Sequence, residues 1–172
     1  MSTSQSLLPH NAMALHVGVA APQRRWAMPL SAAVPLRRPL AEAFITSGGL
    51  VNGDELAALL RAVAPAGGMA AVPQPISRVA QWIVSGAVVA FGGPHEWLLP
   101  LFQFDLSTGT VRPGMAALRA ELQAVFDEIE LALWFVAPND WLGGARPALV
   151  LRSDLPAVLR AARADRYVAR GG

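Results

Sequence analysis

The chain contains no cysteine and no lysine, and its apolar segments are all short. Without cysteine, disulfides and thiolate metal sites are excluded. A membrane-spanning helix needs roughly 20 consecutive apolar residues, so we expect no association with a membrane. The N-terminal residues also lack the charged-then-apolar order of a signal peptide. We therefore expect a cytoplasmic protein.

Side chains suited to catalysis are scarce. The three histidines, His10, His16 and His95, have no acidic or cysteine companion at a useful spacing. The acidic residues within 127–130 form a cluster, but acidic residues commonly occupy the first turn of a helix, where they favour the positive end of its dipole. We therefore expect no enzymatic activity, no cofactor and no metal site.

The 172 residues are 53% hydrophobic, which is enough to bury a sizeable core, and all 14 cationic side chains are arginine. These charges are unevenly distributed. Residues 113–140 carry one arginine against five acidic residues, whereas residues 141–172 carry six arginines against two aspartates. The two segments should attract each other, or each should meet a partner of complementary charge.

The first part of the chain predicts an arm followed by two helices. Residues 1–46 contain five prolines and two Arg-Arg pairs without a sustained period, which indicates a flexible or loosely docked arm. Asn52 and Glu55 have the spacing of a capping box and predict a helix over about 53–64. A second helix should begin near Pro75 and stop at Gly86. Its apolar face is expected to comprise Ile76, Val79, Ala80, Ile83 and Val84.

A β-hairpin should follow these two helices. Residues 87–91 and 96–104 resemble strands, and Gly92-Gly93-Pro94 separates them. Pro100 should restrict the second strand to a sheet edge or end its regular pairing. Helix, helix and hairpin is the order of a small winged helix, so residues 47–105 predict a helix-turn-helix-like module with a β-hairpin.

This module raises the possibility of DNA binding. Polar side chains at the start of its second helix are the candidate readers of base edges: Gln74, Ser77, Arg78 and Gln81. Residues 48–105 are net acidic, however, and DNA affinity depends on cations that neutralise phosphates. The alternative is a module that only supports the fold or a dimer.

The remaining chain predicts further helices, so the fold class is mainly α. One helix should begin at Pro113, and a second, over about 127–137, should stop at Pro138. A helical turn should follow from Pro147 to Leu151. Asp154 stands where it would cap the last helix.

The junction before that turn concentrates special backbone residues and large side chains. This corner consists of Trp134, Pro138, Asn139, Trp141, Leu142, Gly143, Gly144, Arg146 and Pro147. We expect Trp134, Phe135, Trp141 and Leu142 to belong to the core, because large aromatic side chains favour burial. The two glycines should adopt positive φ.

These residues also carry a resemblance to a known family. The run Leu131–Asn139, the segment Leu142-Gly143-Gly144-Ala145-Arg146-Pro147, and the later Val158-Leu159 with Ala161-Ala162-Arg163 look like the toxin-binding domain of Xre/MbcA/ParS-type antitoxins. The resemblance covers about 113–170, and we expect the domain over 113–172. The segment 99–105, Leu-Pro-Leu-Phe-Gln-Phe-Asp, is similar to an element that precedes this domain in a subset of these proteins. The loop of about ten residues between the first two predicted helices departs from the usual helix-turn-helix, whose turn has three or four.

The resemblance implies a function. Antitoxins of this family bind RES-type toxins, which consume NAD, and their C-terminal region covers the NAD cavity; the complex often represses its own operon. Four arginines of the last predicted helix are then the expected toxin contacts: Arg160, Arg163, Arg166 and Arg170. Alternatively, these side chains form a solvated face that pairs with the acidic segment 121–130.

Three hypotheses therefore stand. The first is an antitoxin that binds and sterically inhibits a RES-type toxin, with operator DNA and a second copy of the chain as further expected partners. The second is a DNA-binding regulator without a toxin. The third is an oligomerising or structural protein with neither activity.

Overall fold

The computed structural model describes residues 37–63, 74–93 and 96–172, and its fold is mainly helical, as predicted. The first half contains α1 (Arg37–Phe44), β1 (Leu50–Asn52), α2 (Gly53–Val63), α3 (Pro75–Val84), β2 (Phe91–Gly93) and β3 (Glu96–Pro100). The second half contains β4 (Phe104–Asp105), β5 (Thr110–Val111), α4 (Met115–Leu122), α5 (Glu128–Val136), α6 (Pro147–Val150) and α7 (Leu155–Ala169). Three short 3-10 turns, η1 (Ile45–Ser47), η2 (Leu101–Gln103) and η3 (Asp140–Leu142), join them. Within these ranges, no helix combines the length and the apolarity that crossing a bilayer demands.

The helices after α1 begin at or close to the positions that the sequence signals give; α4 begins at Met115, two residues after the predicted Pro113. Asn52 and Glu55 form the predicted reciprocal cap of α2, each side chain accepting a 2.8 Å hydrogen bond from the other's backbone N–H. Pro75 starts α3, and Asp127 caps α5 in a capping box with Glu130. Asp154 caps α7 by accepting a 2.8 Å bond from the N–H of Ala157. Such caps satisfy the orphan N–H groups of a first turn, which is why short sequence motifs locate helix starts well.

Three strands form an antiparallel sheet in the order β1-β3-β2. Leu50 lies opposite Pro100, and Phe91 lies opposite Leu98. A hairpin is therefore present, but its first strand is shifted: β2 keeps only Phe91 of the predicted 87–91 and includes Gly92 and Gly93, which were expected in the turn. β1 is a strand that the sequence did not reveal. β3 is central, so Pro100 does not mark an edge; it ends the strand. Residues 104–105 pair instead with β5 in a second, two-stranded sheet.

The predicted arm is wrong for residues 37–46, because they form α1 and the beginning of η1. Phe44 is completely buried, and its ring lies 6.0 Å from that of Phe91. The helix has only eight residues, so its apolar positions complete too few turns to produce a recognisable period. Residues 1–36 of the predicted arm lie outside the described part of the chain.

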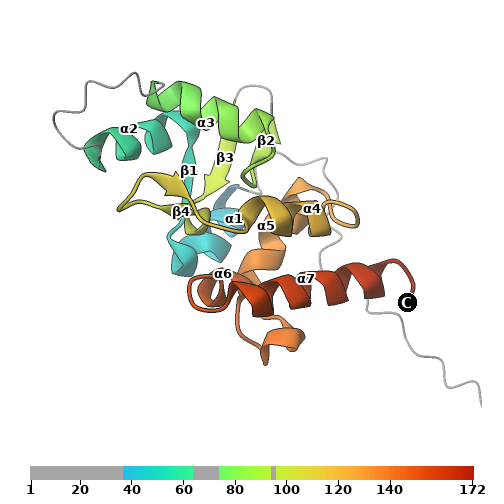
Figure 1. Cartoon of the computed structure of the whole chain (residues 1–172). Coiled ribbons are helices and arrows are strands. Elements are labelled where there is room, and N and C mark those ends of the chain that lie inside the picture. Colours follow the sequence, from blue (N-terminus) through green and yellow to red (C-terminus); the bar gives the residue numbers. More distant parts are fainter. Residues whose placement is uncertain (1–36, 64–73, 94–95) are drawn as a thin grey trace, which may run out of the picture.

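The three-stranded sheet separates two hydrophobic clusters. Val88 and Ala90 pack into the cluster beneath α2 and α3, whereas the alternating Val89 and Phe91 pack into the cluster formed with α1 and α4–α7. Alternation of side chains along an extended chain produces this division. Figure 1 shows α2 and α3 at one end of the molecule and α7 at the other. The second cluster thus draws residues from both sides of the predicted boundary between 47–105 and 113–172.

The buried face of α3 differs from the expected one. Of the five predicted positions, Val79 is buried and Ile83 is partly buried against the same cluster, whereas Ile76 is 47% exposed and Val84 is 88% exposed. Trp82 packs against Phe104, with ring centroids 5.7 Å apart, so an aromatic contact turns α3 away from the simple apolar stripe. The apolar spacing predicted the helix correctly, but it did not predict correctly which side of the helix faces the core.

Gln103 hydrogen-bonds the segment after β3 to the segment before β2. Its side chain is fully buried, accepts a 2.7 Å hydrogen bond from the N–H of Val89, and donates a 2.8 Å bond to the carbonyl of Val89. The amide therefore pairs with the backbone of Val89 as a strand would. Its neighbours Phe102 and Phe104 enter opposite clusters. This arrangement explains the composition of the segment Phe102-Gln103-Phe104.

We predict that Gln103→Ala lowers the free energy of unfolding by about 3 kcal/mol, because it leaves two buried backbone groups of Val89 without partners. Gln81→Ala, at an exposed position of α3, is the control and should change it by less than about 0.5 kcal/mol. Urea unfolding monitored by circular dichroism measures both. Equal midpoints for the two variants would contradict the proposed role of the Gln103 amide.

Candidate functional site

The predicted corner forms a closed loop around Asn139. Its N–H donates to the carbonyl of Ala145 at 3.1 Å, and its carbonyl accepts from the N–H of Gly144 at 2.9 Å. Its side-chain oxygen caps η3 by accepting from the N–H of Trp141 at 3.0 Å. Asn139 is only 7% exposed. One buried side chain and its backbone thus fix the loop between α5 and α6.

Asp165 of α7 holds this corner against the last helix. Its Oδ2 accepts from Trp134 Nε1 at 2.7 Å and from Asn139 Nδ2 at 2.7 Å. Its Oδ1 accepts from Trp141 Nε1 at 2.8 Å. Three N–H donors from one short segment therefore converge on a single carboxylate. Hydrogen bonds to a charged acceptor are about twice as strong as neutral ones, so the contact fixes the corner and α7 relative to each other.

Sequence reasoning missed Asp165, although a signal exists. Val158, Ala161 and Ala162 are the buried residues of α7, and Asp165 stands three and four positions after the two alanines. It therefore lies on the inner face of the helix. A carboxylate there requires donors, and the two indole N–H groups of the corner are the donors that an apolar segment can provide.

The large side chains of the corner divide between core and surface. Trp134 and Phe135 are buried, as expected, with their rings edge to face at 5.1 Å. Leu142 is half-buried, but Trp141 is 59% exposed, so the prediction of a core position is wrong for Trp141. The indole N–H of Trp141 donates to Asp165 at the surface. The ring itself extends from η3 toward solvent.

The backbone requirements of the corner match the predictions. Gly143 and Gly144 adopt φ values of 63° and 83°, which favour glycine. Pro138 follows the end of α5, and Pro147 begins α6 and is buried. Arg146 reaches back to the hydroxyl of Thr46 in η1. The basic residue before Pro147 therefore joins the corner to the N-terminal region.

The predicted arginines lie on α7 but differ in their contacts. Arg160, Arg163 and Arg170 are exposed and, together with Tyr167, form one stripe at helical spacing. Arg163 Nε lies 2.9 Å from Glu121 Oε1, and Arg166 pairs with Oε2 of the same carboxylate. Pairing with the acidic segment thus applies to Arg163 and Arg166. Within the described residues, Arg160 and Arg170 have no ion pair.

The candidate DNA contacts also differ in their environments: three are exposed, and one is bound within the protein. Gln74, Ser77 and Gln81 are exposed at or along α3. Arg78 instead donates to the carbonyl of Gly109 at 2.9 Å and stacks on Trp82, 5.1 Å from the ring centroid. Its guanidinium is therefore engaged within the protein and holds α3 against the turn between β4 and β5.

Asp105 shapes that same turn. Its Oδ1 accepts hydrogen bonds from the Ser107 hydroxyl at 2.6 Å and from the Ser107 N–H at 3.0 Å. These bonds lower the pKa of Asp105, the hydroxyl contact having the largest effect. They favour the charged carboxylate and so stabilise the turn that carries Gly109.

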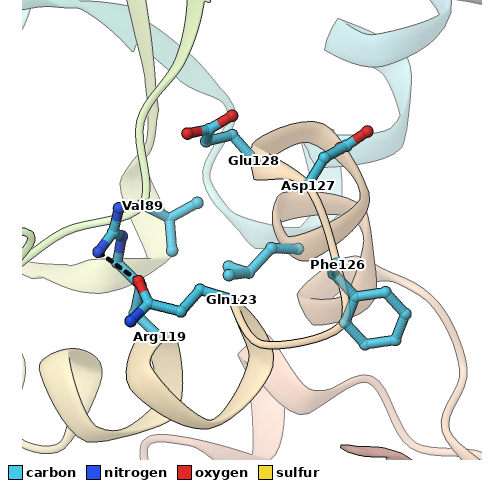
Figure 2. A pocket seen from close by; sticks show the side chains of 7 residues that line it. Val89, Arg119, Gln123, Phe126, Asp127 and Glu128 are labelled. Carbon is cyan, nitrogen blue, oxygen red and sulfur yellow. Dashed lines mark hydrogen bonds between the residues drawn. The ribbon is translucent and has the colours of Figure 1, made fainter. Parts of the chain in front are cut away.

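A separate pocket of about 250 Å³ lies between the starts of β2 and α5 and the end of α4 (Figure 2). Its lining consists of Val89, Arg119, Gln123, Phe126, Asp127, Glu128 and Leu131. Arg119 donates to Gln123 at 2.8 Å, and Asp127 is used by the cap of α5. The polar groups of the pocket are thus largely committed to each other. Across the described ranges, no three His, Cys, Asp or Glu side chains gather as a metal site would require.

Comparison with protein-family models, with curated proteins and with solved structures found no match. The resemblance to the Xre/MbcA/ParS-type toxin-binding domain therefore rests on the residues of the corner and of α7. The geometry gives those residues a physical reason: the Pro-Asn step, the Gly-Gly pair and the Arg-Pro step build one rigid junction.

We predict that Trp134→Phe and Trp141→Phe destabilise the fold unequally, although each removes one N–H donor from Asp165. Trp134 is 7% exposed, so its loss leaves an unfilled volume and removes one of the two buried donors to Asp165 Oδ2, costing about 2–3 kcal/mol. At Trp141 water replaces the donor, and we expect less than about 1 kcal/mol. Denaturant unfolding of both variants measures the difference, and a larger effect at Trp141 would contradict the assigned burial.

Proposed function

We propose that this chain is a partner-binding protein of the Xre/MbcA/ParS antitoxin kind, which acts in the cytoplasm and inhibits a RES-type, NAD-consuming toxin. The observation that carries the proposal is the surface built by the corner and α7, which Asp165 makes rigid. The resemblance in sequence falls on these same elements.

The composition of this surface supports a protein partner. Trp141 and Tyr167 are exposed at 59% and 66%, and Arg160 and Arg170 are exposed cations without an internal ion pair in the described residues. Tryptophan, tyrosine and arginine are the residue types that dominate binding energy at protein interfaces. Because the corner is already ordered by internal hydrogen bonds, binding would lose little conformational entropy.

Inhibition in this scheme requires no chemistry from the antitoxin. The rigid junction places α7 and the residues after it against the mouth of the toxin's NAD cavity, and occupancy of the mouth excludes the substrate. The exposed arginines contribute chiefly to orientation and to the rate of association.

Co-expression with a RES-type toxin encoded beside this chain tests the proposal. We expect the two proteins to co-purify as a stable complex and cellular NAD to remain at the level of cells without toxin. The control is the same toxin expressed with a chain that lacks residues 141–172. Failure of the full chain to bind the toxin or to preserve NAD would overturn the proposal.

We further predict that Arg160→Ala with Arg170→Ala slows association with the toxin roughly 3- to 10-fold at low salt and leaves the stability of the chain unchanged. Arg152→Ala, an exposed arginine that precedes α7, is the matched control. Stopped-flow or surface plasmon resonance at several salt concentrations measures the rates. An effect confined to dissociation would argue against electrostatic steering.

DNA binding is the second candidate, favoured by the topology of the first half. The element order α1-β1-α2-α3-β2-β3, with strand order β1-β3-β2, supports the winged-helix prediction. In that arrangement α3 is the reading helix, and it presents Gln74, Ser77 and Gln81 to solvent. A mobility shift of promoter DNA that depends on salt and is weakened by Gln81→Ala would support this candidate. Loss of binding in Arg78→Ala alone would instead indicate a packing defect.

A further inference from the structure

Trp141 is exposed, yet its orientation is fixed. Its backbone N–H is held by the side chain of Asn139 at 3.0 Å, and its indole N–H is held by Asp165 at 2.8 Å. The ring is nevertheless 59% exposed. A large aromatic side chain that is both exposed and held in place is preorganised for contact with another molecule.

The bond from Trp141 is dispensable for satisfying Asp165 in the folded chain. Trp134 and Asn139, each 7% exposed, already donate to Oδ2 from buried positions. Trp141 donates to Oδ1 from the surface, where water is an equivalent donor. The third bond therefore does little for folding and serves chiefly to set the direction of the indole ring.

The geometry also defines what the ring offers. Because its only polar atom is bonded internally, Trp141 presents apolar surface alone. Val168, three residues after Asp165 on α7, adds exposed apolar surface at 39%. Arg160 and Arg170, five residues before and after Asp165, lie on the side of the helix away from it and do not belong to this surface. The complementary surface is an apolar pocket without an acceptor for the indole N–H.

We propose that Trp141 is the anchor of the partner interface, inserted into an apolar pocket of the partner protein, and that Asp165 is the residue that positions it. This inference rests on the proposed function, since it requires a protein partner on the face formed by the corner and α7. It adds the chemistry of the contact and identifies the residue that fixes the anchor.

The anchor is tested by affinity for a catalytically inactive RES-type toxin, with the full chain throughout. Trp141→Ala should weaken binding roughly 30-fold or more, as expected of a central aromatic contact. Trp97→Ala is the matched control: Trp97 is 42% exposed on β3, and its loss should change affinity less than about 2-fold. If the wild-type chain binds but Trp141→Ala binds equally well, the inference is overturned while the proposed function stands.

The positioning role is tested by a double-mutant cycle. Trp141→Phe and Asp165→Asn each break the same hydrogen bond, so each should weaken binding roughly 5-fold and the double variant should bind no more weakly than either. A merely structural role for Asp165 predicts effects that multiply. Trp141→Phe leaves the buried donors of Asp165 untouched and therefore keeps the test valid even if Asp165→Asn folds poorly.

A measurement on the free chain separates this inference from the proposed function. With ¹⁵N-labelled tryptophan, the indole N–H of Trp141 should relax as a rigid group and exchange slowly, in contrast to that of Trp97. Asp165→Asn should make the two alike. If the wild-type Trp141 ring is already as mobile as Trp97, the inference fails regardless of partner. If the ring is rigid but the wild-type chain binds no toxin, the proposed function fails, and the anchor with it.

Discussion

The architecture depends on the buried pairing of Gln103 with the backbone of Val89. The two hydrogen bonds hold the segment after β3 against the segment before β2, and from these two segments side chains enter both hydrophobic clusters. Phe102 reaches Phe135 of α5, with ring centroids 4.8 Å apart. The helices at the two ends of the molecule are thereby packed on opposite sides of one shared sheet.

The corner, at the other end of the molecule, is also held by hydrogen bonds from buried polar groups. Buried or half-buried polar side chains, here Asn139 and Asp165, satisfy each other and the indole groups around them. Fully satisfied networks of this kind specify one arrangement, because any alternative leaves a polar group without a partner. Apolar packing alone would permit the corner and α7 to shift, whereas the two hydrogen bonds from the buried Trp134 and Asn139 to Asp165 do not.

These two constraints bear on function in different ways. The hydrogen bonds of Gln103 stabilise the fold. Asp165 fixes the orientation of the exposed Trp141 ring on the surface. Glu121 adds a further connection, since its ion pairs with Arg163 and Arg166 join α4 to α7. Of the four predicted arginines, Arg160 and Arg170 have no ion pair within the described residues, so their charge is directed to solvent. This division of roles is what the partner-binding proposal uses.

The sequence by itself determined the starts of α2, α3, α5, α6 and α7, the presence of a hairpin, the positive φ of Gly143 and Gly144, and the mainly helical class. Those features depend on neighbouring residues, through caps, proline, glycine and apolar spacing. Only the tertiary structure decided that Arg78 is held by Gly109, that α3 is rotated toward Trp82, and that Phe44 is buried. It also decided that Trp141 faces solvent and that Asp165, 24 residues later, holds it. Such contacts join residues far apart in the chain, so no local pattern specifies them.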